Sequence, residues 1–169
     1  MLSFNLIVRA VIYHEGQLLV TAVDDGTREL FYTFLGGHLA VDETLASCAI
    51  RQVEEEVGLT VAPVKLLYII ENYFYRGTEK LHEIGYYFLC DLAEQVRGSL
   101  SGHLEPNLKE DIRPEMMNLE DFAVSPFQPK LVREMVMHDF GSSFALCPKL
   151  AVINELPGDV EAESGVFRI

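Results

Sequence analysis

Residues 31–58 constrain the fold of this chain most strongly, because they join a short aromatic strand to a helix through a pair of glycines. The sequence FYTFL is typical of a strand, and Gly36-Gly37 follows it. Apolar residues at helical spacing predict a helix over Glu43–Val57, with Asp42 as its N-cap and Gly58 as its stop. A strand, a glycine turn and a helix in this order indicate a mixed α/β domain.

Strands lie on both sides of this helix in the sequence, and a second helix follows. The expected strands are Leu6–Tyr13 with Leu18–Val23 as one hairpin around a turn at residues 14–17, Val64–Tyr75 with Leu81–Cys90 as another around residues 76–80, then Ile112–Leu119, and finally Phe144–Ile153 interrupted at Pro148. The second helix is expected over Leu131–His138, with Gly141 at its end. This alternation is too sparse for a doubly wound fold, so we expect an α/β fold with a mixed sheet that helices cover on both faces.

The length of 169 residues suits one domain. We expect that domain over residues 1–125, with residues 126–169 as a C-terminal helix and extension packed on it. The last segment, Glu155–Ile169, is acidic and contains Pro and Gly, so we expect it to be loosely held. No apolar run is long enough to span a bilayer, and the N-terminus has no pattern of a secretory signal. We therefore expect no membrane partner.

Charge and cysteine content narrow the classes of partner and compartment. The formal net charge is −13, which argues against broad contact with a nucleic-acid backbone. A small phosphorylated substrate stays possible if a metal ion or a few arginines supply local positive charge. The three cysteines are widely spaced and odd in number, which argues against a disulfide framework or a zinc site. A reducing cytoplasm is the expected location.

The helix over residues 43–57 has two different faces on a helical wheel. Its apolar stripe is expected to be Leu45, Ala46, Ala49, Ile50, Val53 and Val57. Glu55 and Glu56 fall on a neighbouring face together with Gln52, whereas Glu54 points elsewhere into solvent. Two adjacent carboxylates near a surface repel by a few kcal/mol. A hard cation such as Mg²⁺ or Mn²⁺ would remove this repulsion, and the simpler alternative is an acidic face solvated by water.

The spacing of these residues resembles the signature of the Nudix hydrolase family. That signature reads G-x5-E-x7-R-E-U-x-E-E-x-G-U, in which U is a bulky apolar residue. Here five residues separate Gly37 from Glu43, seven separate Glu43 from Arg51, and the chain continues Gln-Val-Glu-Glu-Glu-Val-Gly-Leu to residue 59. A looser resemblance extends from about residue 6 to residue 123 and includes the stretch HEIGYYFLCDL.

This resemblance implies a Nudix-type α/β/α sandwich and hydrolysis of a nucleoside diphosphate linked to another moiety, with Mg²⁺ or Mn²⁺ as cofactor. It implies metal ligation by Glu55, Glu56 and the backbone carbonyl of Gly36. It also implies that Arg51 orients its neighbours by ion pairing and that Glu43 supports the site through the loop. Glycines at this position let the backbone approach an ion closely.

Gln52 departs from the signature, because the family usually has a Glu there that ligates metal or acts as general base. An amide oxygen can still bind a cation, so Gln52 stays a candidate metal ligand and site residue, but it cannot accept a proton at neutral pH. Losing a general base typically costs about 10²–10⁴ in rate. A base or a further metal ligand can come from a distant loop. The candidates are Glu83, Glu105, Glu110 and Asp111, and Glu110 is our choice for the additional metal ligand.

Further residues have a functional and a purely structural interpretation. His82-Glu83 could face a cleft or could be a polar pair at a strand edge. Arg9 and Arg28 could contact phosphates. Cys48 lies on the metal side of the helix, although a small buried thiol is the simpler interpretation. Aromatic side chains that could stack on a base, or belong to the core, are Phe31, Tyr32, Phe74 and Tyr75.

The sequence therefore leaves three alternative functions. The first is a metal-dependent pyrophosphohydrolase that acts on a small nucleotide or nucleotide-sugar, with dimers being usual for the family. The second is a Nudix-fold nucleotide-binding or regulatory module that has weak or no catalysis because of Gln52. The third is an interaction domain whose acidic helix is only solvated.

Overall fold

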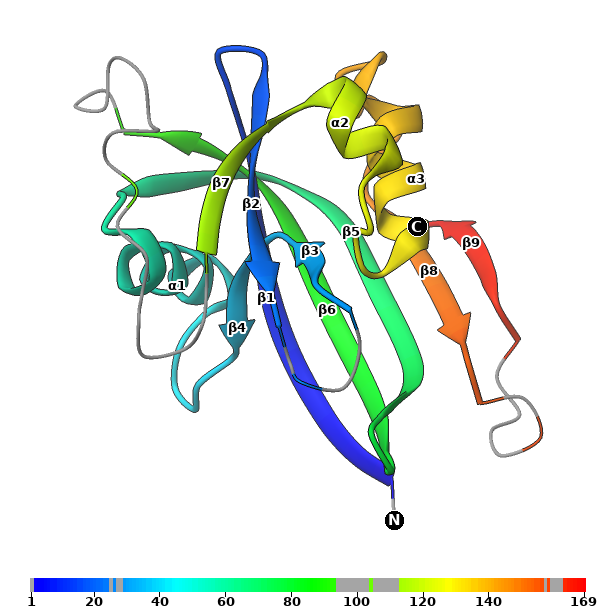
Figure 1. The fold of residues 1–169 in the computed structure, drawn as a ribbon. Coiled ribbons are helices and arrows are strands. Elements are labelled where there is room, and N and C mark those ends of the chain that lie inside the picture. The colour runs from blue at the N-terminus through cyan, green and yellow to red at the C-terminus, as the bar shows by residue number, and fades with distance from the viewer. Residues whose placement is uncertain are drawn as a thin grey trace.

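The fold is an α/β structure built on one mixed sheet (Figure 1). The computed structural model describes residues 2–24, 26, 29–93, 104, 113–156, 158 and 163–169. Its elements in chain order are β1 (Leu2–His14), β2 (Gln17–Val23), β3 (Phe31–Thr33), β4 (Leu35–His38), α1 (Leu45–Val57), β5 (Val61–Arg76), β6 (Glu79–Leu92), β7 (Arg113–Asn118), α2 (Leu119–Val124), α3 (Lys130–Phe140), β8 (Lys149–Asn154) and β9 (Gly165–Arg168).

The described strands form a nine-stranded sheet in the order β3-β2-β1-β6-β5-β8-β9, with β4 paired to β1 and β7 paired to β2. The pairs β1–β6 and β5–β8 are parallel, whereas β1–β2 and β5–β6 are antiparallel hairpins. The sheet is therefore mixed, as expected from the sequence. The chain after residue 125 joins the same sheet, because β8 extends it beyond β5.

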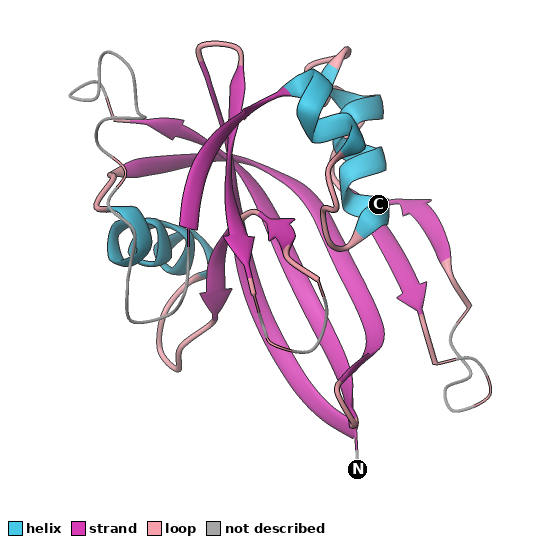
Figure 2. Ribbon diagram, viewed as in Figure 1, coloured by secondary structure: helices cyan, strands magenta, loops and turns pink. Residues whose placement is uncertain are grey.

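Helices pack on both faces of the sheet (Figure 2). Side chains alternate along β1, so that Val11 belongs to the apolar cluster of α2 and α3, whereas Ala10 and Ile12 belong to the cluster of α1. Phe122 of α2 and Val53 of α1 are both fully buried, one in each cluster. Two separate cores on opposite faces confirm the expected α/β/α arrangement.

Both expected hairpins are confirmed, and other element boundaries are corrected. The strand expected over residues 31–35 is two strands, because β3 pairs with β2 and β4 pairs with β1. Gly36 and Gly37 lie inside β4 rather than after a strand. The return to the sheet near residue 112 is confirmed as β7, but Leu119 starts the short helix α2, where a strand was expected.

The start of α1 differs from the prediction. Thr44, not Asp42, caps the helix, since its side chain accepts from the backbone N–H of Ser47 while its own backbone is extended. Asp42 has a φ of 68° and lies in the preceding turn, so it cannot hold the cap position. Gly58 ends the helix in the left-handed region with a φ of 69°, which confirms the expected stop.

The C-terminal region also differs from the prediction in two places. The strand expected over Phe144–Ile153 is shorter, because residues 141–146 form turns and β8 begins only at Lys149. The end of the segment expected to be loosely held forms β9, which pairs antiparallel with β8. The helix expected over Leu131–His138 is confirmed as α3, with Gly141 as its C-cap.

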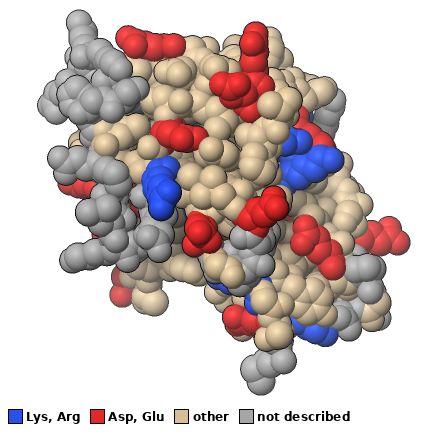
Figure 3. Space-filling view, viewed as in Figure 1, with Lys and Arg blue, Asp and Glu red and all other residues tan. Residues whose placement is uncertain are grey.

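On the face drawn in Figure 3, acidic side chains are scattered and basic side chains are few. The described residues form no continuous basic patch on this face. Among the described helices, none has the length and apolar character needed to cross a membrane.

Candidate active site

Glu56 and Gly36 join helix α1 to strand β4. The backbone N–H of Gly36 donates to Oε1 of Glu56 at 3.0 Å, and Glu56 is only 6 % exposed. The carbonyl oxygen of Gly36 accepts a hydrogen bond from Nη1 of Arg9 at 2.8 Å. The same Nη1 donates to the carbonyl oxygen of Phe34 at 3.1 Å. A carboxylate, a backbone carbonyl and a guanidinium therefore lie within one hydrogen-bonded group.

Gly36 is required at this position for a steric reason. Its φ is +139°, and a Cβ atom there would overlap the carbonyl oxygen of Val8 on the paired strand β1. Only glycine lets β4 lie this close to β1. The close approach brings the Gly36 peptide against both Arg9 and Glu56.

Arg51 connects the loop before α1 to the helix. Its guanidinium donates to both carboxylate oxygens of Glu43, at 2.6 and 3.0 Å, and to Glu55 at 3.1 Å. Nη2 also donates to the carbonyl oxygen of His38 at 3.2 Å. The hydrogen bonds from Arg51 and from the backbone N–H of Ala40 lower the pKa of Glu43 to about 2. Glu43 therefore stays ionised and holds the loop.

Gln52 lies against the second glycine of β4. Its Nε2 donates to the carbonyl oxygen of His38 at 3.4 Å, and a Cβ atom on Gly37 would come within 2.8 Å of the amide group. The amide therefore faces the loop that Arg51 also holds. In this position Gln52 can act as a metal ligand or can simply hold the end of β4 against α1.

The helical wheel is corrected in its rotation. Cys48 and Glu56 are buried, whereas Ala46, expected in the apolar stripe, is exposed. Glu54 is exposed, in agreement with the wheel. Glu55 and Glu56 separate, because the side chain of Glu55 is 59 % exposed and pairs with Arg51.

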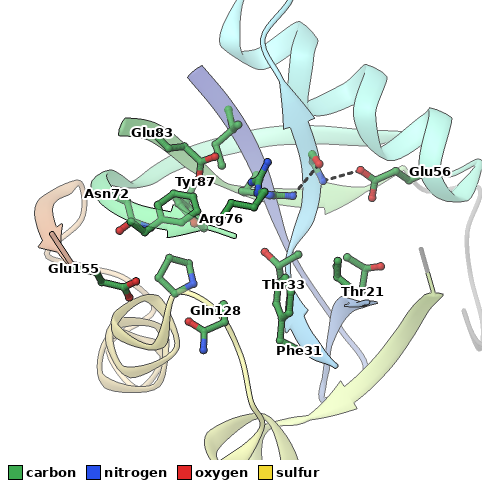
Figure 4. A pocket seen from close by; sticks show the side chains of 16 residues that line it. Thr21, Phe31, Thr33, Glu56, Asn72, Arg76, Glu83, Tyr87, Gln128 and Glu155 are labelled. Carbon is green, nitrogen blue, oxygen red and sulfur yellow. Dashed lines mark hydrogen bonds between the residues drawn. The ribbon is translucent and has the colours of Figure 1, made fainter. Parts of the chain in front are cut away.

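A cleft with a volume of about 370 Å³ opens beside Glu56 (Figure 4). This volume lies within the range of small-molecule sites. Side chains alternate along the strands, so every second residue faces the cleft. The sheet residues that line it are Ile7 and Arg9 of β1, Thr21 and Val23 of β2, Phe31 and Thr33 of β3, Gly36 of β4, Asn72, Phe74 and Arg76 of β5, and Glu83 and Tyr87 of β6.

Some of the predicted site residues line this cleft and others do not. Gly36 and Glu56 line it, whereas Arg51, Gln52 and Glu55 are not among its lining residues. Glu83 lines the cleft, and its neighbour His82 points the other way, where it contacts Glu71 at 2.9 Å and stacks on Tyr73. Three of the candidates for base or metal ligand, Glu105, Glu110 and Asp111, lie outside the described residues, as does Arg28.

The remaining candidates are placed as follows. Phe31 and Phe74 line the cleft, whereas Tyr32 and Tyr75 do not. Cys48 is buried, and this burial together with Glu43 raises the pKa of its thiol to about 11. A neutral buried thiol is a poor ligand for a hard cation.

The oxygen donors fit a hard divalent cation in kind. Mg²⁺ is bound in proteins through one or two carboxylates, with water completing its six positions. Glu56 supplies a carboxylate, and the Gly36 carbonyl keeps a second lone pair beside the hydrogen bond from Arg9. Within the described part of the chain, no three His, Cys, Asp or Glu side chains are grouped to hold a metal. The donor set therefore fits a water-rich Mg²⁺ or Mn²⁺ site.

Sequence reasoning missed several cleft residues. Asn72, Thr21 and Thr33 could have been found from strand alternation once the strand partners were known. Glu155, which follows β8, carried no sequence signal, because its position depends on the pairing of β8 with β5.

Comparisons with known proteins point to one family. The model of the NUDIX domain matches residues 4–135. Similar solved structures include a NUDIX hydrolase from Nitrosomonas europaea (18 % identity, TM-score 0.63, covering 83 % of this chain and 90 % of that one) and a MutT protein from Bacillus halodurans (12 %, 0.62, 96 % and 97 %). Another is an ADP-ribose pyrophosphatase from Streptococcus suis (20 %, 0.59, 89 % and 98 %). These identities show a shared fold alone. In a comparison with curated protein sequences, none matches this chain.

Proposed function

The chain belongs to the Nudix hydrolase family, and from this membership we propose that it is a metal-dependent pyrophosphohydrolase that cleaves a nucleoside diphosphate linked to another moiety. The observation that carries the proposal is the group formed by Glu56, Gly36 and Arg9 at one end of the cleft. An anionic diphosphate needs positive charge, and this end combines a guanidinium with oxygen donors for a cation. Solved structures of the same fold are named ADP-ribose pyrophosphatase and UDP-X diphosphatase, which supports this substrate class.

Arg9 is suited to bind a phosphate oxygen. Its Nη1 donates to the backbone carbonyls of Phe34 and Gly36. Its Nε is buried without a hydrogen-bond partner among the described residues. The two backbone carbonyls fix the plane of the guanidinium. A fixed guanidinium loses little entropy when it binds an anion, so it is a good phosphate ligand. Arg76 also lines the cleft and is exposed, so it can add charge at the entrance.

The residues that would hold Mg²⁺ or Mn²⁺ are Glu56, the Gly36 carbonyl, Gln52 and Glu55, with Glu110 as a further candidate. When bound, the cation would neutralise phosphate charge and would lower the pKa of a coordinated water. Arg51 holds Glu55 and Glu43, so it orients the carboxylate that would take part. Gly36 orients Glu56 through its backbone N–H.

The general base stays open among four carboxylates. Glu83 lines the same cleft and is the candidate that the structure describes. Glu105, Glu110 and Asp111 are the alternatives. Gln52 cannot serve, because an amide does not take up a proton at neutral pH.

A binding or regulatory role is the second candidate, and Gln52 favours it. Its amide donates to the carbonyl oxygen of His38 at the end of β4, a bond that the carboxylate usual in the family could not make. In this case the protein binds a nucleotide in the cleft without efficient turnover. We also propose a cytoplasmic location, since the cysteines are free, and a homodimer, the assembly usual for the family.

The experiment is hydrolysis of a nucleotide and nucleotide-sugar panel with Mg²⁺ or Mn²⁺, by the wild-type protein and by Gln52→Glu. Turnover by the wild-type protein that is lost on removal of the metal supports the pyrophosphohydrolase. Saturable binding without turnover, together with activity gained in Gln52→Glu, supports the binding module. No binding and no turnover in either protein would contradict both.

A further inference from the structure

The end of the cleft away from Glu56 contains a buried polar atom that lacks a partner. Asn72 of β5 is only 8 % exposed, and its Oδ1 has no hydrogen-bond partner among the residues that the structure describes. Buried polar atoms are almost always paired, because burial removes the water that would otherwise bind them. Asn72 lines the cleft, so a bound ligand can supply the missing donor.

Two carboxylates lie near Asn72 and line the same cleft. Glu83 is the direct cross-strand partner of Asn72 in the β5–β6 pair, which places both side chains next to each other on one face of the sheet. Glu155 follows β8 and points into the cleft beside Asn72 (Figure 4). Both lie at the opposite end of the view from Glu56.

Glu155 is held in place by its backbone. Its N–H donates to the carbonyl oxygen of Tyr73 at 2.8 Å, and the next residue, Leu156, is buried and donates to Oδ1 of Asn154 at 2.8 Å. The chain is therefore fixed on both sides of an exposed carboxylate. A fixed backbone lowers the entropy that this segment loses when Glu155 binds a ligand.

These side chains offer acceptors, so the matching ligand must offer donors. A carboxylate has no donor, and the free atom of Asn72 is an amide oxygen. We infer that Asn72 and Glu155 form a specificity subsite for a substrate group that carries O–H or N–H donors, such as sugar hydroxyls or the amino group of a nucleobase. Charge repulsion disfavours a phosphate directly beside Glu155.

The subsite deepens the proposed function, since it selects the moiety on one side of the diphosphate. The matched region ends at residue 135, and Glu155 comes from the segment after it. The C-terminal segment thus contributes to ligand selection.

The test measures dissociation constants by calorimetry in EDTA, so that no hydrolysis occurs. The variants are Glu155→Gln and Asn72→Leu, and the control is Glu163→Gln, which removes a charge from the same segment but does not line the cleft. The probes are ADP-ribose, ADP, 2′,3′-dideoxy-ADP, IDP and pyrophosphate. We expect each variant to bind ADP-ribose about tenfold more weakly. Pyrophosphate affinity should be unchanged.

The smaller probes identify the source of the donors. If sugar hydroxyls bind here, the wild-type protein should prefer ADP to dideoxy-ADP, and Glu155→Gln should lose that preference. If the base binds here, the lost preference should be ADP over IDP. Unchanged preferences in both variants, an equal loss in Glu163→Gln, or no wild-type binding of ADP-ribose would overturn the inference. Binding without hydrolysis after metal is restored would contradict only the proposed function.

Discussion

The backbone N–H of Gly36 donates to Glu56 at 3.0 Å, and this bond fixes one carboxylate of helix α1 at the wall of the cleft. Glu55, one position earlier, instead pairs with Arg51 at the surface. A run of acidic residues is thereby divided into groups with different environments.

Replacing Glu56 with Gln should weaken metal binding without unfolding the protein. The amide oxygen can still accept from Gly36, so thermal stability should change little, whereas the lost charge should weaken Mn²⁺ binding at least tenfold. Calorimetry with Mn²⁺ and a melting curve measure the two effects. Glu54→Gln is the matched control, because Glu54 is exposed on the same helix, and its Mn²⁺ affinity should equal that of the wild-type protein. Equal losses in both variants would contradict a role for Glu56.

Replacing Gly36 with Ala should destabilise the fold. The added Cβ would meet the carbonyl oxygen of Val8 at a φ that side chains disfavour, so we expect a loss of at least about 2 kcal/mol in the free energy of unfolding. Urea denaturation measures it. Gly77→Ala is the comparison, since Gly77 also has a positive φ but has open space around it, and it should lose only about 1 kcal/mol. A smaller loss in Gly36→Ala than in Gly77→Ala would show that the close approach of β4 to β1 is not tight.

Glu43 should make the stability of the protein depend on acid pH. Its pKa is lowered from 4.5 to about 2, so the folded state binds this proton less tightly than the unfolded state. The stabilisation is complete above pH 4.5 and is lost as the pH falls towards 2. Glu43→Gln should lower the melting temperature at pH 7 and flatten its decline over that acid range. Melting curves of both proteins across the range measure this, and parallel declines would contradict the ion pair with Arg51.

Asp139 should be essential for attachment of the C-terminal segment. It is 2 % exposed and accepts from Lys149 at 2.5 Å and from the hydroxyl of Tyr68 at 3.1 Å. Burial alone would raise its pKa, but the hydrogen bonds from Lys149 and His138 outweigh burial, so the net effect lowers the pKa. Asp139→Asn should leave the Lys149 charge uncompensated and cost about 3–5 kcal/mol.

Tyr68→Phe is the milder companion of Asp139→Asn, because it removes one hydrogen bond and keeps the ion pair. It should cost about 1 kcal/mol. Urea denaturation compares both variants with the wild-type protein. If the free energy of unfolding falls by a similar amount in the two variants, the ion pair between Asp139 and Lys149 contributes no more than the hydrogen bond from Tyr68.

The sequence by itself determined the local elements and the family. Helix α1, its glycine stop and both hairpins follow from spacings within one segment, because helix and strand periodicity are local properties of the chain. The spacing from Gly37 to Leu59 carried the resemblance, which the family match over residues 4–135 confirms. The N-cap was wrong by two residues, since Asp42 and Thr44 are both good caps and only the turn conformation decides between them.

Only the tertiary structure decided which side chains meet in the cleft. The rotation of α1 is set by its packing against the sheet, and this packing turned Glu56 inward and left Ala46 and Glu55 exposed. Arg9, Asn72 and Glu155 come from distant segments that strand pairing brings together. The parallel pairs β1–β6 and β5–β8 join strands that are far apart in the sequence, so spacings within one segment do not predict which strands pair.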